Sequence, residues 1–291
     1  MNKDCSWREV LARQIAPAYA SNPHVEAVFI FGSVARGWAD CYSDIELGIV
    51  WLQPPTEAEL QAAALSAGAQ RREAAPYNEA GQSWSEMFYV DGVRIETVHW
   101  THETIDNIIA DVVERFDVTQ NFLMFPKQAT VSAVQKNISL YGVELLETWK
   151  YKVAEYPDGL AVAMVKKHLR FSSFGSREML AGRNEIPLIH ENNSHTVRLL
   201  LNLLFGLNRM YHPTFKWTKY FVAEMTIIPP QFFARLERVY RSDPVSGTQE
   251  LQSLVKETLD LVEKHLPQID LQAQREEFEK TYESWPRGNQ R

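Results

Sequence analysis

The sequence contains little cysteine and no long apolar run. Cys5 and Cys41 are its two cysteines among 291 residues, and no Cys-x-x-Cys pattern occurs. Neither a disulfide framework nor a cysteine-ligated zinc site is therefore expected. The strongly apolar stretch at 199–207 is too short to span a bilayer, and the opening MNKDCSWREV lacks the apolar core of a signal peptide. We expect a soluble cytoplasmic protein that does not associate with a membrane.

An excess of positive charge is also absent. The chain carries 30 lysines and arginines against 37 aspartates and glutamates, a formal net charge of −7 at pH 7. Proteins dedicated to nucleic-acid binding usually carry a basic face, so we expect no nucleic-acid partner. The acidic balance is typical of a well-solvated surface, and it also favours a cationic ligand by raising its local concentration.

Strand patterns lie in the first half of the chain. The segments HVEAVFIF at 24–31 and SDIELGIVWL at 43–52 are rich in β-branched and apolar residues and are followed by glycine or proline. The segment 83–100 holds the turn dipeptide Asp91-Gly92 between two strand-like runs, which predicts a β-hairpin. These patterns indicate a sheet in this part of the chain.

Two helices of the same region have recognisable caps. Thr56 followed by Glu59 forms a capping-box pattern, and we predict a helix from there to Gly68. Thr101 is the expected cap of a second helix that ends near Phe116. Helices therefore alternate with the predicted strands, as in an α/β domain.

The character of the sequence changes near Tyr141. Beyond this point strand patterns nearly disappear and helical periodicity dominates, with proline and glycine in the loops. We predict an α+β protein with an N-terminal α/β domain over residues 1–135. An all-helical domain is predicted over residues 136–291.

The stretch FGSVARGWADCYSDIELGIV, residues 31–50, places two acids in an apolar strand. Asp44 and Glu46 are two residues apart, so their side chains share one face, roughly 7 Å apart at Cα, opposite Ile45 and Leu47. Two carboxylates this close repel each other unless a cation lies between them. Mg²⁺ accepts oxygen ligands, and two metals about 4 Å apart can clamp the attacking and leaving oxygens of a phosphoryl or nucleotidyl transfer.

Gly32 and Ser33 precede this acidic pair. They follow a predicted strand and open a short helical turn, a geometry that presents backbone N–H groups to an anion. Glycine permits a close approach of the backbone, and the Ser33 hydroxyl can bind a phosphate oxygen. No Gly-Lys-Ser/Thr follows, so this is not a Walker-type P-loop. One short segment thus offers a phosphate cradle and a pair of metal ligands.

A third acid is expected from a neighbouring strand. Glu96 lies in the apolar run VRIETV at 93–98, which we expect to be an antiparallel neighbour, and it can reach the same metals. It can also act as general base on an acceptor hydroxyl. Glu86 and Asp91 are weaker candidates, because Asp91 lies in a turn and Glu86 precedes the stronger strand.

The order Gly-Ser, Asp-x-Asp/Glu and a later acid resembles the signature of the nucleotidyltransferase superfamily, which includes DNA polymerase β. The segment GSVARG…YSDIELGI is most similar to the small bacterial antibiotic nucleotidyltransferases, such as streptomycin, kanamycin and lincosamide adenylyltransferases. The resemblance covers about residues 25–100. Many members have aspartate where this chain has Glu46, a change that keeps the charge and the reach to a metal.

This resemblance implies a mixed β-sheet flanked by helices and a magnesium-dependent adenylyltransferase. Gly32 and Ser33 would bind ATP or another NTP, Asp44 and Glu46 would hold two Mg²⁺ ions, and Glu96 would be metal ligand, base or both. AMP would pass to a hydroxyl of a small molecule, an antibiotic such as an aminoglycoside or lincosamide, and pyrophosphate would leave. The helical domain would close the nucleotide and acceptor cleft, and the expected role is antibiotic resistance.

A bound triphosphate also calls for cationic side chains. Lys216, in HPTFKWTKYF, is the preferred candidate in the helical half, and Arg36 either contacts the triphosphate or caps its local turn. Further basic candidates from the helical half are Lys166, Lys167, Arg170, Arg198, Arg209 and Lys219.

The sequence does not identify the acceptor. A polycationic aminoglycoside would use loop acids, whereas a less charged acceptor would use aromatic walls, and the chain has eight tryptophans. A same-fold enzyme that modifies a protein or RNA, as in toxin–antitoxin systems, and a nucleotide-binding regulator without activity are the alternatives. The nucleobase and the oligomeric state are also undecided. The loop acids are Glu79, Glu86, Glu185 and Glu191.

Overall fold

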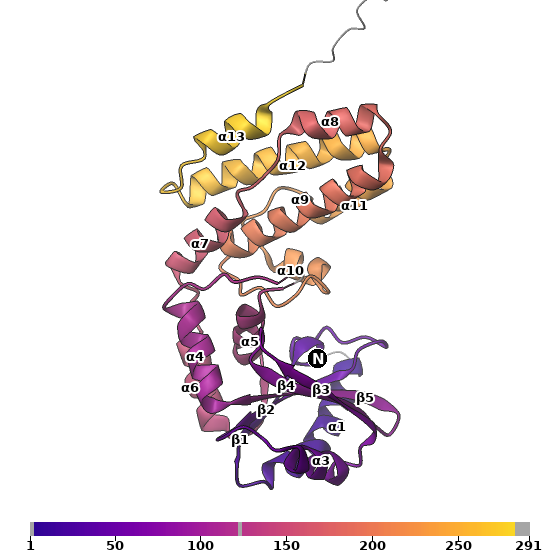
Figure 1. Cartoon of the computed structure of the whole chain (residues 1–291), viewed down its shortest axis with the longest axis vertical. Coiled ribbons are helices and arrows are strands. Elements are labelled where there is room, and N and C mark those ends of the chain that lie inside the picture. The colour runs from indigo at the N-terminus through magenta and orange to yellow at the C-terminus, as the bar shows by residue number, and fades with distance from the viewer. Residues whose placement is uncertain (1–2, 122–123, 283–291) are drawn as a thin grey trace, which may run out of the picture. The chain divides into compact units, whose positions relative to one another are not determined.

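The structure is a computed structural model, and it describes residues 3–121 and 124–282. The chain forms two compact units, Met1–Pro157 with Tyr211–Phe215, and Asp158–Met210 with Lys216–Arg291. A six-stranded mixed sheet lies in the first unit, and the second is built from helices (Figure 1). The predicted α+β fold class is confirmed.

The sheet has the strand order β3-β4-β5-β2-β1-β6. β2 and β5 pair in parallel, and the other neighbouring strands pair antiparallel, so the sheet is mixed. Asp91 and Gly92 join β4 to β5 with φ angles of 50° and 78°, the positive values that tight hairpin turns require, which confirms the predicted hairpin. The strands are β1 (Val25–Phe31), β2 (Ile45–Trp51), β3 (Gln70–Asn78), β4 (Ser83–Val90), β5 (Val93–Thr101) and β6 (Ile138–Tyr141).

The alternating residues of β2 determine which face is buried. Ile45, Leu47 and Ile49 are fully buried in one core cluster with residues of α1 (Lys3–Ala20) and α3 (Glu57–Ser66). Each such side chain stabilises the fold by roughly 1.5–3 kcal/mol through its removal from water. The pleat therefore turns the residues between them toward the opposite face.

Both predicted helix caps are present. The Thr56 side chain accepts a hydrogen bond from the Glu59 backbone and the Glu59 side chain accepts one from the Thr56 N–H, which completes the capping box of α3. The Thr101 hydroxyl accepts from the Thr104 N–H at the start of α4 (His102–Val113). These caps satisfy N–H groups that have no partner within their helices.

The first unit extends past residue 135, where the sequence suggested a boundary. α5 (Pro126–Gln135) leads into β6, which pairs with β1, and α6 (Val143–Lys152) packs on the same strands. Gly142 connects β6 to α6 with a φ of 68°, and a Cβ there would lie 2.0 Å from the Glu26 carbonyl oxygen. The close approach of this turn to β1 requires glycine.

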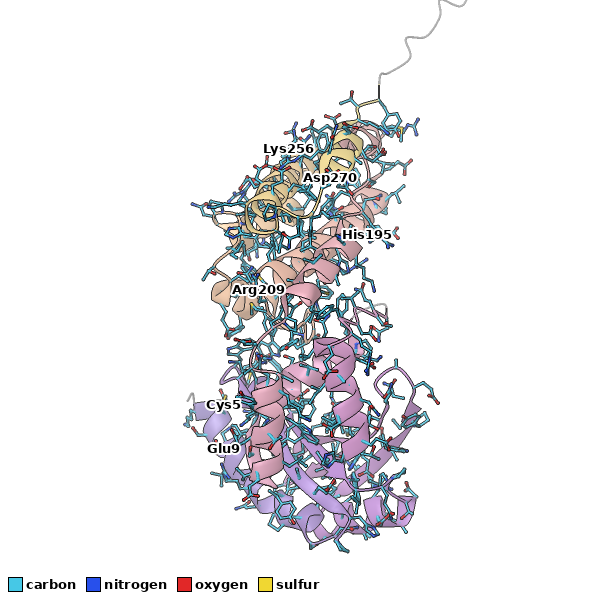
Figure 2. All side chains as sticks on the ribbon, turned by 90° about the vertical axis from the view of Figure 1, so that its left-hand side faces the viewer. Cys5, Glu9, His195, Arg209, Lys256 and Asp270 are labelled. Atoms are coloured by element: carbon cyan, nitrogen blue, oxygen red, sulfur yellow. The ribbon has the colours of Figure 1, made fainter. Side chains whose placement is uncertain are left out.

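The second unit is organised around α9 (Ile186–Leu207), which packs against α7 (Asp158–His168) and α12 (Pro244–His265). Just beyond α9, Arg209 donates to Asp158 at 2.6 Å (Figure 2). No helix among the described residues combines the length and apolarity needed to cross a membrane. The other helices of this unit are α8 (Phe174–Gly182), α10 (Thr218–Glu224), α11 (Phe232–Arg241) and α13 (Gln272–Glu279).

Candidate active site

Strand pairing brings two of the predicted carboxylates together. The expected antiparallel pairing of the Glu96 strand is wrong: β2 and β5 run in parallel, because the long connection through α3, β3 and β4 returns the chain in the same direction. Glu46 is directly opposite Glu96, so both side chains leave the same face of the sheet on strands about 4.8 Å apart. Asp44 stands just before β2, which begins at Ile45. The three acids predicted from spacing are therefore grouped at one end of the parallel pair.

Gly32 forms the other side of this group. It begins α2 (Gly32–Ala35) with a φ of 67°, directly after β1, whose last residue Phe31 pairs with Glu46. A Cβ at Gly32 would lie 1.5 Å from Glu46 Oε2, so the carboxylate packs against the glycine backbone. Glycine is required here both for its backbone conformation and for the space it leaves.

Ser33 and Arg36 occupy the turn beyond Gly32. Ser33 is buried, whereas Arg36 is half-buried and its Nη2 donates to Ser132 Oγ on α5 at 2.6 Å. The Arg36 guanidinium also lies 5.2 Å from the centre of the Trp38 ring. The Arg36 backbone N–H caps α2 by donating to the Gly32 carbonyl. Phosphate contacts by Ser33 and Arg36 stay predictions.

Arg94 is a member of this group that the sequence reasoning missed. Its Nη1 lies 3.7 Å from Asp44 Oδ2 and its Nη2 lies 3.6 Å from Glu96 Oε2. Arg94 precedes Glu96 by two residues on β5, and this spacing, which places both on one face, was the available signal. The arginine side chain is 49% exposed, so water reaches it and the pairs are weak.

The carboxylates suit Mg²⁺ by their chemistry, because oxygen ligands are what this ion prefers. Their present arrangement is not that of a metal site: in the described part of the chain, no group of three or more His, Cys, Asp or Glu side chains is placed to hold a metal ion. The Arg94 guanidinium instead bridges Asp44 and Glu96. A half-exposed arginine can leave this position by rotating about its side-chain bonds.

Glu86 lies on the opposite face of the sheet from Glu96. It pairs with Thr97 on β5, whose side chain points away from that of Glu96, and it is buried against Arg72 and His99. Burial opposes the charged form, but hydrogen bonds from His99 and Arg72 hold the pKa of Glu86 below its ordinary value. The geometry therefore favours Glu96 over Glu86 as the third acid of the group.

Burial holds the pKa of His99 below its ordinary value, although Glu86 favours the charged ring. Trp51 Nε1–H donates to His99 Nδ1 at 3.1 Å, which leaves Nε2 to carry the proton toward Thr97 Oγ1 at 2.9 Å and Glu86. Complete burial lowers the pKa of His99, because a charged ring would lose its hydration. Trp51, Glu86 and His99 thus connect β2, β4 and β5 on the face of the sheet opposite Glu96.

A pocket opens beside the acidic group in the first unit. It has a volume of about 320 Å³, and Asp44 and Arg94 form part of its wall. Residues of α1, of the loop before β2 and of the β4–β5 hairpin form the remainder. The pocket therefore reaches the acidic group through Asp44, and all of its lining residues belong to the first unit.

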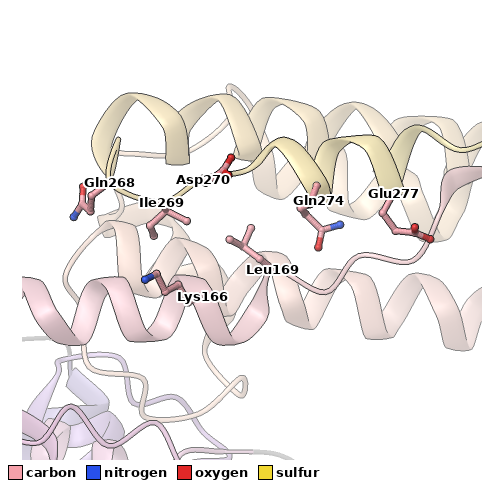
Figure 3. Close-up of a pocket in the computed structure, with 8 residues that line it drawn as sticks. Lys166, Leu169, Gln268, Ile269, Asp270, Gln274 and Glu277 are labelled. Atoms are coloured by element: carbon pink, nitrogen blue, oxygen red, sulfur yellow. The ribbon is translucent and has the colours of Figure 1, made fainter.

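Except for Arg36, the basic residues predicted for the triphosphate belong to the second unit. Lys216 precedes α10, and Lys166 lines a separate pocket of about 590 Å³ together with Asp270 and Glu277 (Figure 3). Arg209 is paired with Asp158. A contact of Lys216 with phosphates stays a prediction.

Comparison with known proteins gives a family match and similarities to solved structures. Residues 122–218 match a family described as a domain of unknown function, DUF4037. No curated protein matches the chain. Among solved structures, a nucleotidyltransferase-like protein from Exiguobacterium sibiricum is similar, with 13% identity, coverage of 89% of this chain and 78% of that chain, and a TM-score of 0.39. A likeness of this strength does not decide a reaction or a substrate.

Proposed function

We propose that this chain is a magnesium-dependent nucleotidyltransferase that moves the nucleoside monophosphate of an NTP, with ATP as the preferred donor, onto a hydroxyl of a small molecule. The observation that carries the proposal is the alignment of Glu46 with Glu96 on parallel strands, with Glu46 packed against the backbone of Gly32. Asp44 stands beside them. Carboxylates grouped against a glycine turn repel each other and do not stabilise a strand face, so their grouping favours a binding role.

In the reaction, the acceptor oxygen bonds to the α-phosphorus and the bond from that phosphorus to the β-phosphate bridging oxygen breaks. Pyrophosphate leaves, and Glu96 takes the hydroxyl proton as general base. Asp44, Glu46 and Glu96 would hold two Mg²⁺ ions, which would neutralise charge on the attacking and leaving oxygens. The Glu96 side chain is 38% exposed, so an acceptor hydroxyl can reach it.

Gly32 has a second role in this proposal. The absence of a side chain leaves room for the Glu46 carboxylate, and the backbone N–H groups of the turn at Gly32 and Ser33 would bind a phosphate of the NTP. Arg94 would release Asp44 and Glu96 when metal enters, since one cation replaces another between the same carboxylates.

The test is a screen for transfer of label from [α-³²P]NTP in the presence of Mg²⁺. The acceptors are aminoglycosides, lincosamides, other hydroxylated small molecules, proteins and RNA. We expect labelling of a small molecule by the wild type and its loss in Asp44→Asn. The matched control is Asp91→Asn, which makes the same change at the exposed hairpin turn and should leave transfer unchanged.

Two results would contradict the proposal. Full activity of Asp44→Asn would show that Asp44 holds no essential metal. ATP binding without transfer to any acceptor would favour a nucleotide-binding regulator, for which the Arg94 bridge between Asp44 and Glu96 would be the resting arrangement.

A further inference from the structure

The pocket beside Asp44 has the size and position of a site for the acceptor. Its volume of about 320 Å³ falls in the range that small ligands occupy. Asp44 and Arg94 belong both to the pocket wall and to the acidic group. A molecule in the pocket therefore lies against Asp44, one of the carboxylates that the proposed transfer reaction uses.

Aromatic side chains form much of the pocket wall. Trp7 comes from α1, Tyr42 from the loop before β2 and Tyr89 from β4. Trp7 is 39% exposed and Tyr42 is 92% exposed, although burial of an aromatic ring stabilises a protein. Exposed rings gathered around a pocket are suited to stacking on a flat ring of a ligand.

Arg8 makes part of this wall rigid. It is 3% exposed, its Nε donates to the Ser43 carbonyl at 3.0 Å and its Nη1 donates to the Asp4 carbonyl at 2.8 Å. Its guanidinium also lies 4.2 Å from the centre of the Trp7 ring. Trp7 and the loop before β2 are thus held by the same buried arginine, and a ligand meets a preformed surface.

The charges of the lining do not suit a polycation. Among the described lining residues Asp44 is the one carboxylate, and it already lies 3.7 Å from the Arg94 guanidinium, while Arg8 is paired with Asp4 at 3.5 Å. The loop acids expected for a polycationic acceptor do not line this pocket in the described part of the chain; they are Glu79, Glu86, Glu185 and Glu191. The lining instead combines rings with a few polar groups, which suits a neutral ring compound that carries hydroxyls.

We propose that this pocket is the acceptor subsite and that it takes an uncharged, hydroxyl-bearing ring compound stacked on Trp7, Tyr42 and Tyr89. This inference rests on the proposed nucleotidyl transfer and specifies its acceptor class. The stacked ring presents a hydroxyl toward Asp44, at the edge that the pocket shares with the acidic group.

Cys41 allows binding to be measured without any transfer activity. It is exposed and lines the pocket, whereas Cys5, the other cysteine, is fully buried. The rate of Cys41 alkylation by iodoacetamide, followed by mass spectrometry, reports whether the pocket is occupied. The probes are phenyl β-D-glucoside, a neutral hydroxylated ring compound, and neamine, a polycation.

We expect phenyl β-D-glucoside to slow alkylation of Cys41 in a saturable way and neamine to have no effect. Trp7→Leu and Tyr42→Ser should each weaken this protection by up to roughly tenfold, because a stacked aromatic pair contributes about 0.5–1.5 kcal/mol. Tyr42 is so exposed that its replacement leaves folding intact. Tyr151→Leu, a change at an equally exposed tyrosine on α6, is the matched control and should keep full protection.

The outcomes separate this inference from the proposed function. Protection by neamine but not by the glucoside, or unchanged protection in both Trp7→Leu and Tyr42→Ser, overturns the assignment of the ring compound. If an acceptor is found and its rate of transfer is unchanged in both Trp7→Leu and Tyr42→Ser, the assignment of the subsite is overturned. The proposed reaction would still hold in that case. Protection by the glucoside without transfer to any acceptor overturns the acceptor role together with the proposed function.

Discussion

The two faces of the β4–β5 hairpin carry similar charged groups in opposite settings. On one face Glu86 is 2% exposed and contacts Arg72 and His99. On the other face the half-exposed Glu96 lies 3.6 Å from Arg94. A buried charge must keep its partner, whereas a hydrated charge can exchange one partner for another. The buried cluster is thus suited to holding the strands together, and the exposed group is suited to binding.

Filling the space at Gly32 should have a large effect on activity. Gly32→Ala places a Cβ 1.5 Å from Glu46 Oε2 and so displaces that carboxylate. A displacement of this size should lower transfer at least about 100-fold. Gly37→Ala is the control, because Gly37 has a similar φ of 75° but nothing within 4 Å of its Cβ position. Equal loss of activity in both variants would assign the effect to backbone strain and not to the site.

Removing the buried acid should affect stability more than removing the exposed one. Glu86→Ala leaves Arg72 without its buried partner and should lower the free energy of unfolding by roughly 3–5 kcal/mol. Glu96→Ala, at a half-exposed position, should change it by less than about 1 kcal/mol. Urea denaturation of the two variants measures the difference. Similar values for both would show that the two faces do not differ as described.

Acidification should destabilise the buried cluster. Because burial lowers the pKa of folded His99, the unfolded chain, with a histidine pKa of about 6.5, binds the proton first. The contribution of His99 to the free energy of unfolding is thus fully present above about pH 6.5. Below this pH it falls by up to about 1.4 kcal/mol per pH unit. The lowered pKa of Glu86 adds a loss of the same sign at lower pH, as the pH falls through its folded-state value.

The comparison of His99→Gln with the wild type tests this dependence. Urea denaturation between pH 7.5 and pH 5.5 should show a smaller loss of stability in the variant. The dependence of stability on pH should weaken only in part, because burial also lowers the pKa of His168 to about 4. His168 therefore adds a loss of stability in the same direction as the pH falls. An unchanged slope would show that His99 is not held neutral.

The smallest effect is expected for Arg94→Gln. Its two pairs are exposed to water, so the free energy of unfolding should change by less than about 1 kcal/mol. Removal of the competing cation should tighten Mg²⁺ binding by up to roughly fivefold, measured by titration calorimetry without nucleotide. Weaker Mg²⁺ binding in the variant would mean that Arg94 supports the metal arrangement instead of occupying its place.

Much of the fold could be predicted because local signals and burial agree. The hairpin at Asp91-Gly92 and the caps at Thr56 and Thr101 follow from single residues whose geometry is restricted. β3 was not predicted, because it is an edge strand whose residues are nearly all exposed and show no alternation. The short strand β6 was also missed, since three half-buried residues and the exposed Tyr141 carry little pattern.

The candidate site could be predicted only in part. Spacing predicted that Asp44 and Glu46 share a face, and Glu96 was expected from a neighbouring strand. The expected antiparallel pairing was wrong, because no local pattern encodes the parallel pairing of β2 and β5 that sets Glu46 opposite Glu96. Arg94 was missed because the search was for acids, although its spacing from Glu96 placed it on the same face. The contact of Glu46 with Gly32 likewise depends on tertiary structure.

The most direct test of the account compares Glu96→Gln with Glu86→Gln in the transfer of label from [α-³²P]ATP under conditions where both variants are folded. The account predicts that Glu96→Gln lowers transfer about 100-fold to 10,000-fold, the usual contribution of a general base, and keeps its stability. Glu86→Gln should lower stability and retain most of the transfer rate. Transfer that survives in Glu96→Gln and is lost in folded Glu86→Gln would contradict the account, because the chemistry would then belong to the buried face.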